Sequence, residues 1–172
     1  MLLKKLMFLI AMGVAMPVLA QKCDSDKPAT APLNHFKVSA DGATITNIKS
    51  QQTWLRCSLG MAWTENGCEG NSLTYSLAAA EAAVDNLNAH QVAGRTNWRL
   101  PTVEELSTIV EQRCFQPAIN LEAFPSSPES GFWSSTVAAG INARAWVVHF
   151  LHGQRYIANT QQSWRVRPVA DK

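Results

Sequence analysis

The most informative stretch of the sequence is residues 98–106, Trp98-Arg99-Leu100-Pro101-Thr102-Val103-Glu104-Glu105-Leu106. Thr102 and Glu105 have the spacing of a capping box, in which the threonine hydroxyl accepts from the N3 backbone amide and the glutamate bonds back to the cap. Pro101 precedes the cap, where a helix has not yet started. The apolar stripe that follows consists of Val103, Leu106, Ile109 and Val110. We therefore predict a helix that starts at Thr102 and buries this stripe.

A second helix is predicted upstream of this segment. The stretch is rich in alanine and ends before Gly94, a residue type that commonly stops helices. Apolar residues at steps of three and four share one helical face, namely Leu73, Leu77, Ala80, Val84 and Leu87. We therefore expect a helix that begins at Leu73 and buries this face.

Turn-forming residues divide the rest of the chain up to residue 131. Asp41-Gly42 separates residues 36–38 from 43–45, which predicts a hairpin. Residues 56–72 are rich in cysteine, glycine and asparagine, and we expect a loop there. Residues 115–131 contain several prolines, which predicts a long irregular segment.

The C-terminal third has the pattern of strands. Residues 145–151 are rich in aromatic and β-branched side chains, His152-Gly153 forms a turn, and 155–157 can return antiparallel. Residues 164–167 alternate apolar and basic side chains. Two helices followed by an antiparallel sheet predict an α+β fold in one domain, without an internal repeat.

The first twenty residues have the three parts of a secretory signal peptide. Lys4 and Lys5 precede an apolar run, and Val18 and Ala20 are the small residues before a cleavage site. The alternatives are an uncleaved signal anchor and a lipoprotein attached through Cys23, although a lysine stands directly before that cysteine, where lipid attachment needs a small residue. No later segment is apolar enough to cross a bilayer.

These features predict three divisions of the chain: a signal peptide over 1–20, a polar N-terminal arm over 21–35, and one domain over 36–172. A simple leader of this kind is typical of a bacterial secretory protein. We therefore expect export, to the periplasm or to the cell surface and exterior.

The cysteines support the same compartment. Four of them lie beyond the leader, and an even number in an oxidising compartment predicts two disulfides. Four cysteines allow three pairings; the short glycine-rich loop between Cys57 and Cys68 favours that pair, which leaves Cys23 with Cys114. A metal site is the alternative, but the chain has no Cys-x-x-Cys pair with nearby histidines. We expect neither a metal ion nor another cofactor.

Charge is balanced over the chain and uneven within it. Without Lys4 and Lys5, 13 basic side chains face 13 acidic ones, so the chain lacks the basic footprint that sequence-independent nucleic-acid binding needs. Residues 21–130 have a net charge of −4, and residues 131–172 one of +4. The charged residues of this last segment are Arg144, Arg155, Arg165, Arg167, Lys172 and one acid, Asp171.

The arginines of the basic segment are the first ligand candidates. Arg144 and Arg155 flank predicted strands and have no carboxylate near them in sequence, so we expect them to contact an anion. Arg165 and Arg167 are second choices, because they can instead pair with helix carboxylates. The acids available for that pairing are Glu104, Glu105 and Glu111.

The six tryptophans form a second group of candidates. Surface indole rings can stack on sugars, and buried ones fill a core. Trp98, Trp146 and Trp164 lie in or beside predicted regular elements, so we expect them to pack. Trp63 and Trp133 lie in predicted loops, and we take them as the better ligand candidates.

Catalysis has little support in the sequence. Ser135 with His149 or His152 is a possible nucleophile and base, but no nucleophile elbow surrounds the serine. The carboxylates are scattered, so no paired acid and base is indicated. We therefore expect no catalytic residues.

Several segments, taken in order, resemble the Lcl C-terminal domain family over about residues 36–170. The most specific are Trp98-Arg99-Leu100-Pro101-Thr102 and Phe132-Trp133-Ser134-Ser135-Thr136; the others are 54–60, 117–120, 124–125, 145–150 with Gly153, and 166–169. The resemblance implies a C-type-lectin-like α+β domain, with two helices on a twisted antiparallel sheet and with Arg99 as part of the scaffold. The family's namesake is the C-terminal domain of a collagen-like bacterial adhesin that binds sulfated glycosaminoglycans.

Departures from the family and its distant relatives limit what the resemblance implies. Residues 50–54 are Ser-Gln-Gln-Thr-Trp in place of the usual Thr-Gly-Leu-x-Trp, and the chain has no collagen-like region. It also lacks the calcium motif of sugar-binding C-type lectins and the C-terminal cysteine pair of the formylglycine-generating enzymes. Trimerisation, calcium-dependent sugar binding and oxidase chemistry are therefore not implied.

These observations lead to one expectation of function. We expect an exported recognition or adhesion domain that binds an anionic glycan or a protein partner, and that is not an enzyme. The alternatives are a structural subunit of a surface assembly such as a pilus, without glycan affinity, and, less favoured, a hydrolase. We expect no nucleic-acid partner and no membrane span after cleavage of the leader.

Overall fold

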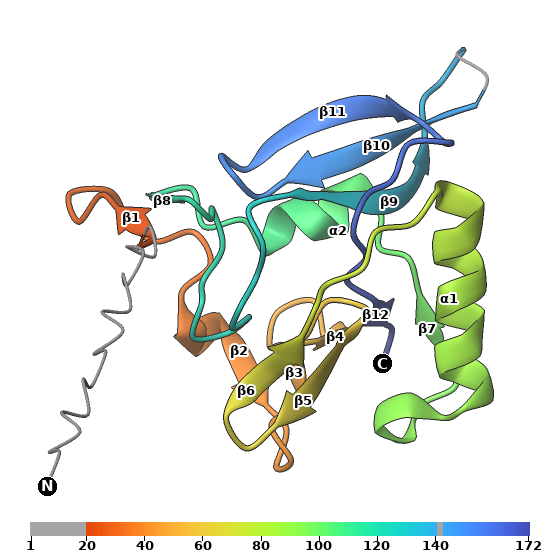
Figure 1. The fold of residues 1–172 in the computed structure, drawn as a ribbon. Helices are drawn as coiled ribbons and strands as arrows, with labels where there is room; N and C mark the ends of the chain where they lie inside the picture. The colour runs from red at the N-terminus through yellow and green to blue at the C-terminus, as the bar shows by residue number, and fades with distance from the viewer. Residues whose placement is uncertain (1–19, 141–142) are drawn as a thin grey trace, which may run out of the picture.

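The computed structural model describes residues 20–140 and 143–172, and the signal peptide predicted over residues 1–20 lies almost entirely outside them. Within the described residues the chain is α+β, with two α-helices, α1 (Leu77–Ala89) and α2 (Val103–Thr108), and mostly antiparallel strands (Figure 1). The predicted α+β class is therefore confirmed. In the described part of the chain no helix is long and apolar enough to span a membrane.

The larger sheet combines strands from the N-terminal and C-terminal parts of the domain. Its strands lie in the order β2-β3-β4-β12-β7, and their bounds are β2 Phe36–Val38, β3 Thr44–Asn47, β4 Thr53–Leu55, β12 Val169–Ala170 and β7 Trp98–Arg99. The hairpin predicted around Asp41-Gly42 is confirmed as β2 and β3. The C-terminal strand β12 inserts between β4 and β7, so Val169 and Ala170 are held in the interior of this sheet.

A second sheet lies at the other end of the molecule, at the top of Figure 1. It has the order β11-β10-β9, with β9 Gly131–Val137, β10 Arg144–His149 and β11 Gln154–Asn159. The predicted C-terminal hairpin is thus confirmed, with an unbroken register from Arg144 opposite Asn159 to His149 opposite Gln154. Residues 164–167 form only isolated bridges, in place of the predicted strand.

Two short antiparallel strand pairs and two 3₁₀ turns complete the described chain. The pairs are β1 Lys22–Cys23 with β8 Cys114–Phe115, which are distant in sequence, and the hairpin of β5 Met61–Thr64 with β6 Gly67–Gly70; the turns are η1 Leu33–His35 and η2 Val92–Gly94. The loop predicted over 56–72 is therefore wrong over residues 61–70, which form the β5–β6 hairpin. Its strands pair Trp63 with Cys68, and a disulfide from Cys68 to Cys57 fixes the hairpin to the domain. The second disulfide joins Cys23 to Cys114, so the favoured pairing is confirmed.

The capped helix has the predicted geometry. Thr102 Oγ1 accepts from the Glu105 amide, and a Glu105 carboxylate oxygen accepts from the Thr102 amide. The other helix starts later than predicted, because Ser76 caps it and Tyr75 is held in extended backbone by two bonds to Trp164. Leu73 consequently lies outside α1 and is 51 % exposed, so its place in the buried stripe was wrong.

Two apolar clusters form the core. One contains α2 side chains with Phe132, Val148 and Phe150, and it reaches Trp54 and Val169 of the larger sheet. The other contains the buried face of α1, and its large members are Leu77, Val84, Trp98, Trp133, Val147 and Val166. Because β9 and β10 contribute side chains to both clusters, they are packed on both faces, and β11 forms the exposed edge of their sheet.

Candidate functional site

Arg144 and Arg155 lie on the same face of the β10–β11 ladder. Arg144 is opposite Asn159, and Arg155 lies four residues before Asn159 on the same strand, so alternation along the strand puts both arginines on one side. Four residues of strand separate their positions by about 13 Å. Trp146 and its cross-strand neighbour Ile157 lie between them on this face. We call these four residues the arginine face.

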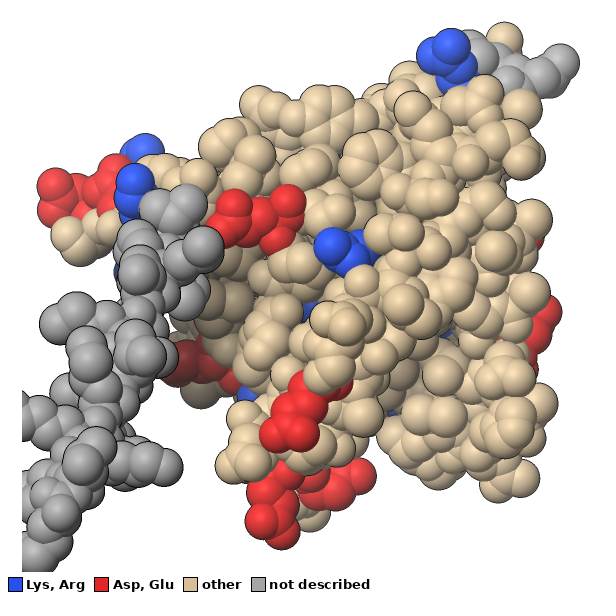
Figure 2. Space-filling view, viewed as in Figure 1, with Lys and Arg blue, Asp and Glu red and all other residues tan. Residues whose placement is uncertain are grey.

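The arginine face is open to solvent and basic. Arg144, Arg155 and Ile157 are exposed, and Trp146 is half-buried. Within residues 20–140 and 143–172, no carboxylate lies at ion-pair distance from either arginine. In Figure 2, acidic side chains lie over the tips of the β2–β3 and β5–β6 hairpins, and others lie at the upper left beside β1 and at the right edge beside α1.

Arg165 and Arg167 have structural contacts. The Arg165 guanidinium donates to the carbonyl of Ser72. Arg167 is completely buried and donates to the carbonyls of Leu55 and Arg56 and to two serine hydroxyls. In the described chain neither arginine pairs with a carboxylate, so the predicted pairing with helix acids was wrong, as was the choice of Arg167 as an anion contact.

The helix acids have other partners. Glu105 pairs with Arg99 at 2.7 Å, and Arg99 also contacts Asp171 at 2.6 Å, which confirms Arg99 as scaffold. Burial alone raises the pKa of Glu105, but the hydrogen bonds from Arg99 and from the Thr102 amide outweigh it and lower the pKa. Glu111 is buried and accepts from the amides of residues 30, 31 and 113.

The two tryptophans predicted to meet a ligand differ in the structure. Trp133 lies within β9, is fully buried and donates from Nε1 to the Tyr75 carbonyl, so it is a core residue and its assignment to a ligand was wrong. Trp63 lies in β5 rather than in a loop, is half-buried, and stacks on the Arg56 guanidinium at 4.3 Å. Figure 1 shows β5 at the opposite end of the molecule from β10 and β11. Trp63 therefore belongs to a different surface from the arginine face.

The tryptophans predicted to pack do so to different extents. Trp98 is buried, which confirms its place in the core. Trp146 and Trp164 are only partly buried against the two clusters. The sequence predicted that Trp146 packs in the interior, but in the structure it is part of the arginine face.

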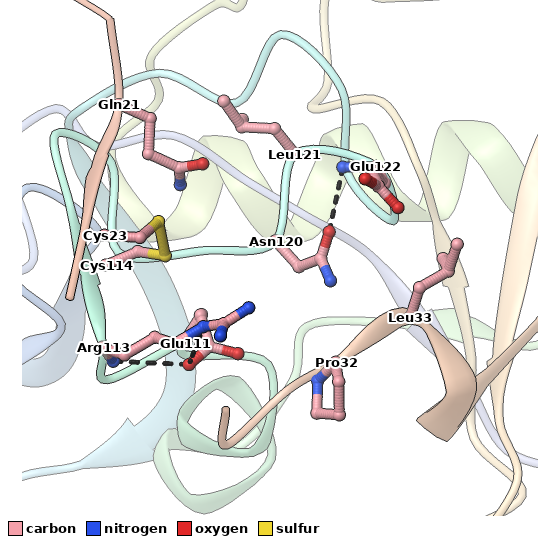
Figure 3. A pocket seen from close by; sticks show the side chains of 10 residues that line it. All are labelled: Gln21, Cys23, Pro32, Leu33, Glu111, Arg113, Cys114, Asn120, Leu121 and Glu122. Atoms are coloured by element: carbon pink, nitrogen blue, oxygen red, sulfur yellow. Dashed lines mark hydrogen bonds and ion pairs between the residues drawn. A yellow bond between two sulfur atoms is a disulfide. The ribbon is translucent and has the colours of Figure 1, made fainter. Parts of the chain in front are cut away.

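A polar pocket lies beside the Cys23–Cys114 disulfide (Figure 3). Its polar groups hold chain segments together: Gln21 Nε2 donates to the Pro117 and Ile119 carbonyls at 2.6 Å each, and Asn120 Oδ1 accepts from the Glu122 amide. Glu111 is likewise occupied by backbone amides. We interpret this pocket as the joint that attaches the N-terminal arm to the domain.

The residues considered for catalysis are not brought together. Ser135 Oγ donates to the Pro101 carbonyl, whereas His149 Nδ1 accepts from the Leu151 amide. His149 lies opposite Gly131 at one end of β9, four residues from Ser135 on that strand. Among the described residues, no three histidine, cysteine or acidic side chains gather in a group that could hold a metal ion.

A family model described as the Lcl C-terminal domain matches residues 43–170, which include both helices, the three-stranded sheet, the five-stranded sheet except β2, and the arginine face. No curated protein matches the chain.

Proposed function

Because the chain belongs to the Lcl C-terminal domain family, we propose that it is an exported recognition domain that binds an anionic glycan at its arginine face, or an acidic protein partner there. The observation that carries this proposal is the placement of Arg144 and Arg155. They lie on one face, exposed, without an acidic partner in the described chain, and with an indole ring between them.

The arginine face has the chemistry that such a ligand needs. A guanidinium group donates two parallel hydrogen bonds to a sulfate or carboxylate group, and an indole ring between two such groups offers a sugar an apolar surface. Each exposed contact contributes little alone, so affinity depends on both arginines together or on several copies of the domain. Binding is therefore expected to weaken steeply with salt.

A glycan array that includes heparin-like chains, read at about 0.05 M and about 0.3 M NaCl, tests this function. We expect binding at low salt, weaker binding at high salt, and loss of binding in the Arg144→Ala/Arg155→Ala double variant. The matched control is Lys37→Ala/Lys49→Ala, which removes the same charge from exposed positions outside the arginine face. Salt-insensitive binding, or full binding by the arginine variant, would exclude this site.

A second candidate function is a structural subunit of a surface assembly. The edge strand β11 favours it, because Tyr156 and Ile157 are exposed by 44 % and 39 % on a strand with one unpaired side. This alternative predicts co-purification with a filament and no glycan affinity. The same array therefore separates the two candidates.

Export is part of the proposal. Two disulfides suit an oxidising compartment, and the first residue after the predicted cleavage site, Gln21, is anchored by two hydrogen bonds. Mass spectrometry of the periplasmic or secreted protein is expected to find Gln21 at the N-terminus. An intact Met1 in the membrane fraction would contradict export.

Two further parts of the proposal concern the fold type and catalysis. We propose that the α+β arrangement is C-type-lectin-like, and that the domain is not an enzyme. A solved structure of the protein compared with C-type lectins tests the first. Covalent labelling by a serine-reactive probe, abolished by Ser135→Ala, would contradict the second.

A further inference from the structure

We propose that a cavity beneath the β5–β6 hairpin binds a small apolar molecule that carries a carboxylate group. The cavity has a volume of about 480 Å³, within the range of small-molecule sites. Its apolar wall includes Leu55, Leu59, Met61, Trp63, Leu87 and Val92. It lies between this hairpin and the segment that follows α1, at the lower end of Figure 1, so it is independent of the arginine face.

Two buried guanidinium groups lie directly behind this wall. Arg167 Nη1 donates to the Leu55 carbonyl at 3.1 Å, and Nη2 donates to Ser58 Oγ at 3.2 Å. Leu55 and Ser58 both line the cavity. The Arg56 guanidinium stacks at 4.3 Å on the ring of Trp63, which also lines it. One layer of residues therefore separates each positive charge from the cavity.

Among the described residues, the groups that bond to Arg56 and Arg167 are uncharged. Arg56 donates to the carbonyls of Gly42, Glu122 and Ala123, and Arg167 to carbonyls and hydroxyls. In the described chain no carboxylate lies at ion-pair distance from either group. Burial lowers the pKa of Arg167 to about 9, which reflects the cost of a buried cation without a counter-ion. An anion in the cavity would offset this cost, because charges near buried groups attract one another more strongly than charges in bulk water.

Ser58 supplies a donor to such an anion. Its side chain is 1 % exposed, lines the cavity and accepts a hydrogen bond from Arg167. Among the hydrogen bonds of the described residues, none uses the proton of this hydroxyl. The Ser58 hydroxyl can therefore donate to a ligand carboxylate, and the guanidinium behind it strengthens that donation.

The one acid of the lining, Asp41, does not reverse this preference. It is exposed, and its carboxylate already accepts from the Ser39 hydroxyl and the Ala43 amide. An exposed charge is screened by water and salt, whereas the buried guanidinium groups are screened much less. The cavity is therefore expected to prefer an anion to a cation, and a ligand amine would bind only if Asp41 dominated.

The test uses three probes with one ring system and different charge: 2-naphthoate, 2-naphthamide and 2-naphthylmethylamine. Titration calorimetry on the leaderless protein is expected to show 2-naphthoate binding about tenfold tighter than the neutral amide, and the amine binding weakest. The preference is expected to persist at about 1 M NaCl, because the charges responsible are buried. The proposal would be overturned by absence of binding, by equal binding of the three probes, by tightest binding of the amine, or by a preference that disappears with salt.

A pair of variants locates the binding. Ala62→Trp fills the cavity from an exposed position in its lining, and Ala78→Trp places the same side chain on the exposed face of α1, away from it. Loss of 2-naphthoate binding is expected in the first and full binding in the second; unchanged binding in Ala62→Trp would overturn the assignment. A measurement on the unaltered protein guards against misfolding of a variant. Nuclear Overhauser effects from the probe are expected to the Met61 methyl and the Trp63 indole, and effects confined to other residues would contradict the site.

Discussion

The two ends of the molecule use arginine in opposite ways. At the three-stranded sheet, Arg144 and Arg155 are exposed and have no acidic partner in the described chain. Around β4 and the β5–β6 hairpin, Arg56 and Arg167 are buried and bonded mainly to backbone carbonyls. The number of basic residues in a region therefore does not identify a binding surface. The guanidinium groups of one end are available to a ligand, whereas those of the other hold the fold.

The largest effect is expected from Arg167→Met. The substitution keeps a long side chain but leaves buried acceptors at Leu55, Arg56, Ser58 and Ser127 without their donor. Relief of the buried charge offsets part of this loss, so we expect the free energy of unfolding to fall by about 3 kcal/mol. Urea denaturation measures it. A variant as stable as the unaltered protein would remove the distinction between the two ends.

The second-largest loss of stability is expected from removal of the disulfide that fixes the β5–β6 hairpin, at the same end of the molecule as Arg167. Cys57→Ala/Cys68→Ala opens a loop with a sequence separation of 11 residues, and we expect a loss of about 2 kcal/mol. Thermal unfolding of the variant measures this loss. Labelling of the denatured, unreduced parent protein is the control, and it is expected to find almost no free thiol; four reactive thiols would contradict both disulfides.

A smaller effect is expected when Arg99 loses its carboxylate partner Glu105. Arg99 is intermediate between the exposed arginines and the buried arginines because it has acidic partners. Hydrogen bonds lower the pKa of Glu105 below its ordinary 4.5, so the carboxylate stabilises the fold above that pH and loses its contribution as the pH falls through the folded-state pKa. Glu105→Gln is expected to lose about 1 kcal/mol at neutral pH and to flatten the fall of stability in acid. Denaturant midpoints across the acid range measure both, and an unchanged acid dependence would refute the assignment.

The smallest effect on stability is expected from Arg144→Ala/Arg155→Ala. Because both side chains are exposed and contact no described acid, the free energy of unfolding should change by less than about 0.5 kcal/mol. The same denaturation experiment checks it. A loss comparable with that of Arg167→Met would show that the arginine face is structural.

Local patterns predicted much of the fold. The capping box at Thr102, the Asp41-Gly42 hairpin and the Cys57–Cys68 pair each depend on residues close in sequence, and each is confirmed. The start of α1 was predicted too early. Two backbone hydrogen bonds between Tyr75 and Trp164, which is distant in sequence, hold the chain before the helix in extended conformation.

Non-local contacts explain the errors at the candidate sites. Trp133 follows a proline-rich stretch and looked like a loop residue, but β9 pairs with β10 and carries it into the core. Arg167 resembled a solvent-facing residue of an alternating strand; its acceptors lie in residues 55–58 and 127, which no local pattern connects to it. The apolar neighbours Val166 and Pro168 were the one local indication of its burial.

Amide chemical-shift mapping with a heparin-derived tetrasaccharide tests most directly whether the exposed arginines form the ligand surface. The largest shifts in the ¹H–¹⁵N spectrum are expected at β10 and β11, around Arg144, Trp146, Arg155 and Ile157, and they should disappear in Arg144→Ala/Arg155→Ala. Shifts confined to the β5–β6 hairpin and its cavity, or unchanged shifts in the double variant, would contradict the division of roles between the two ends.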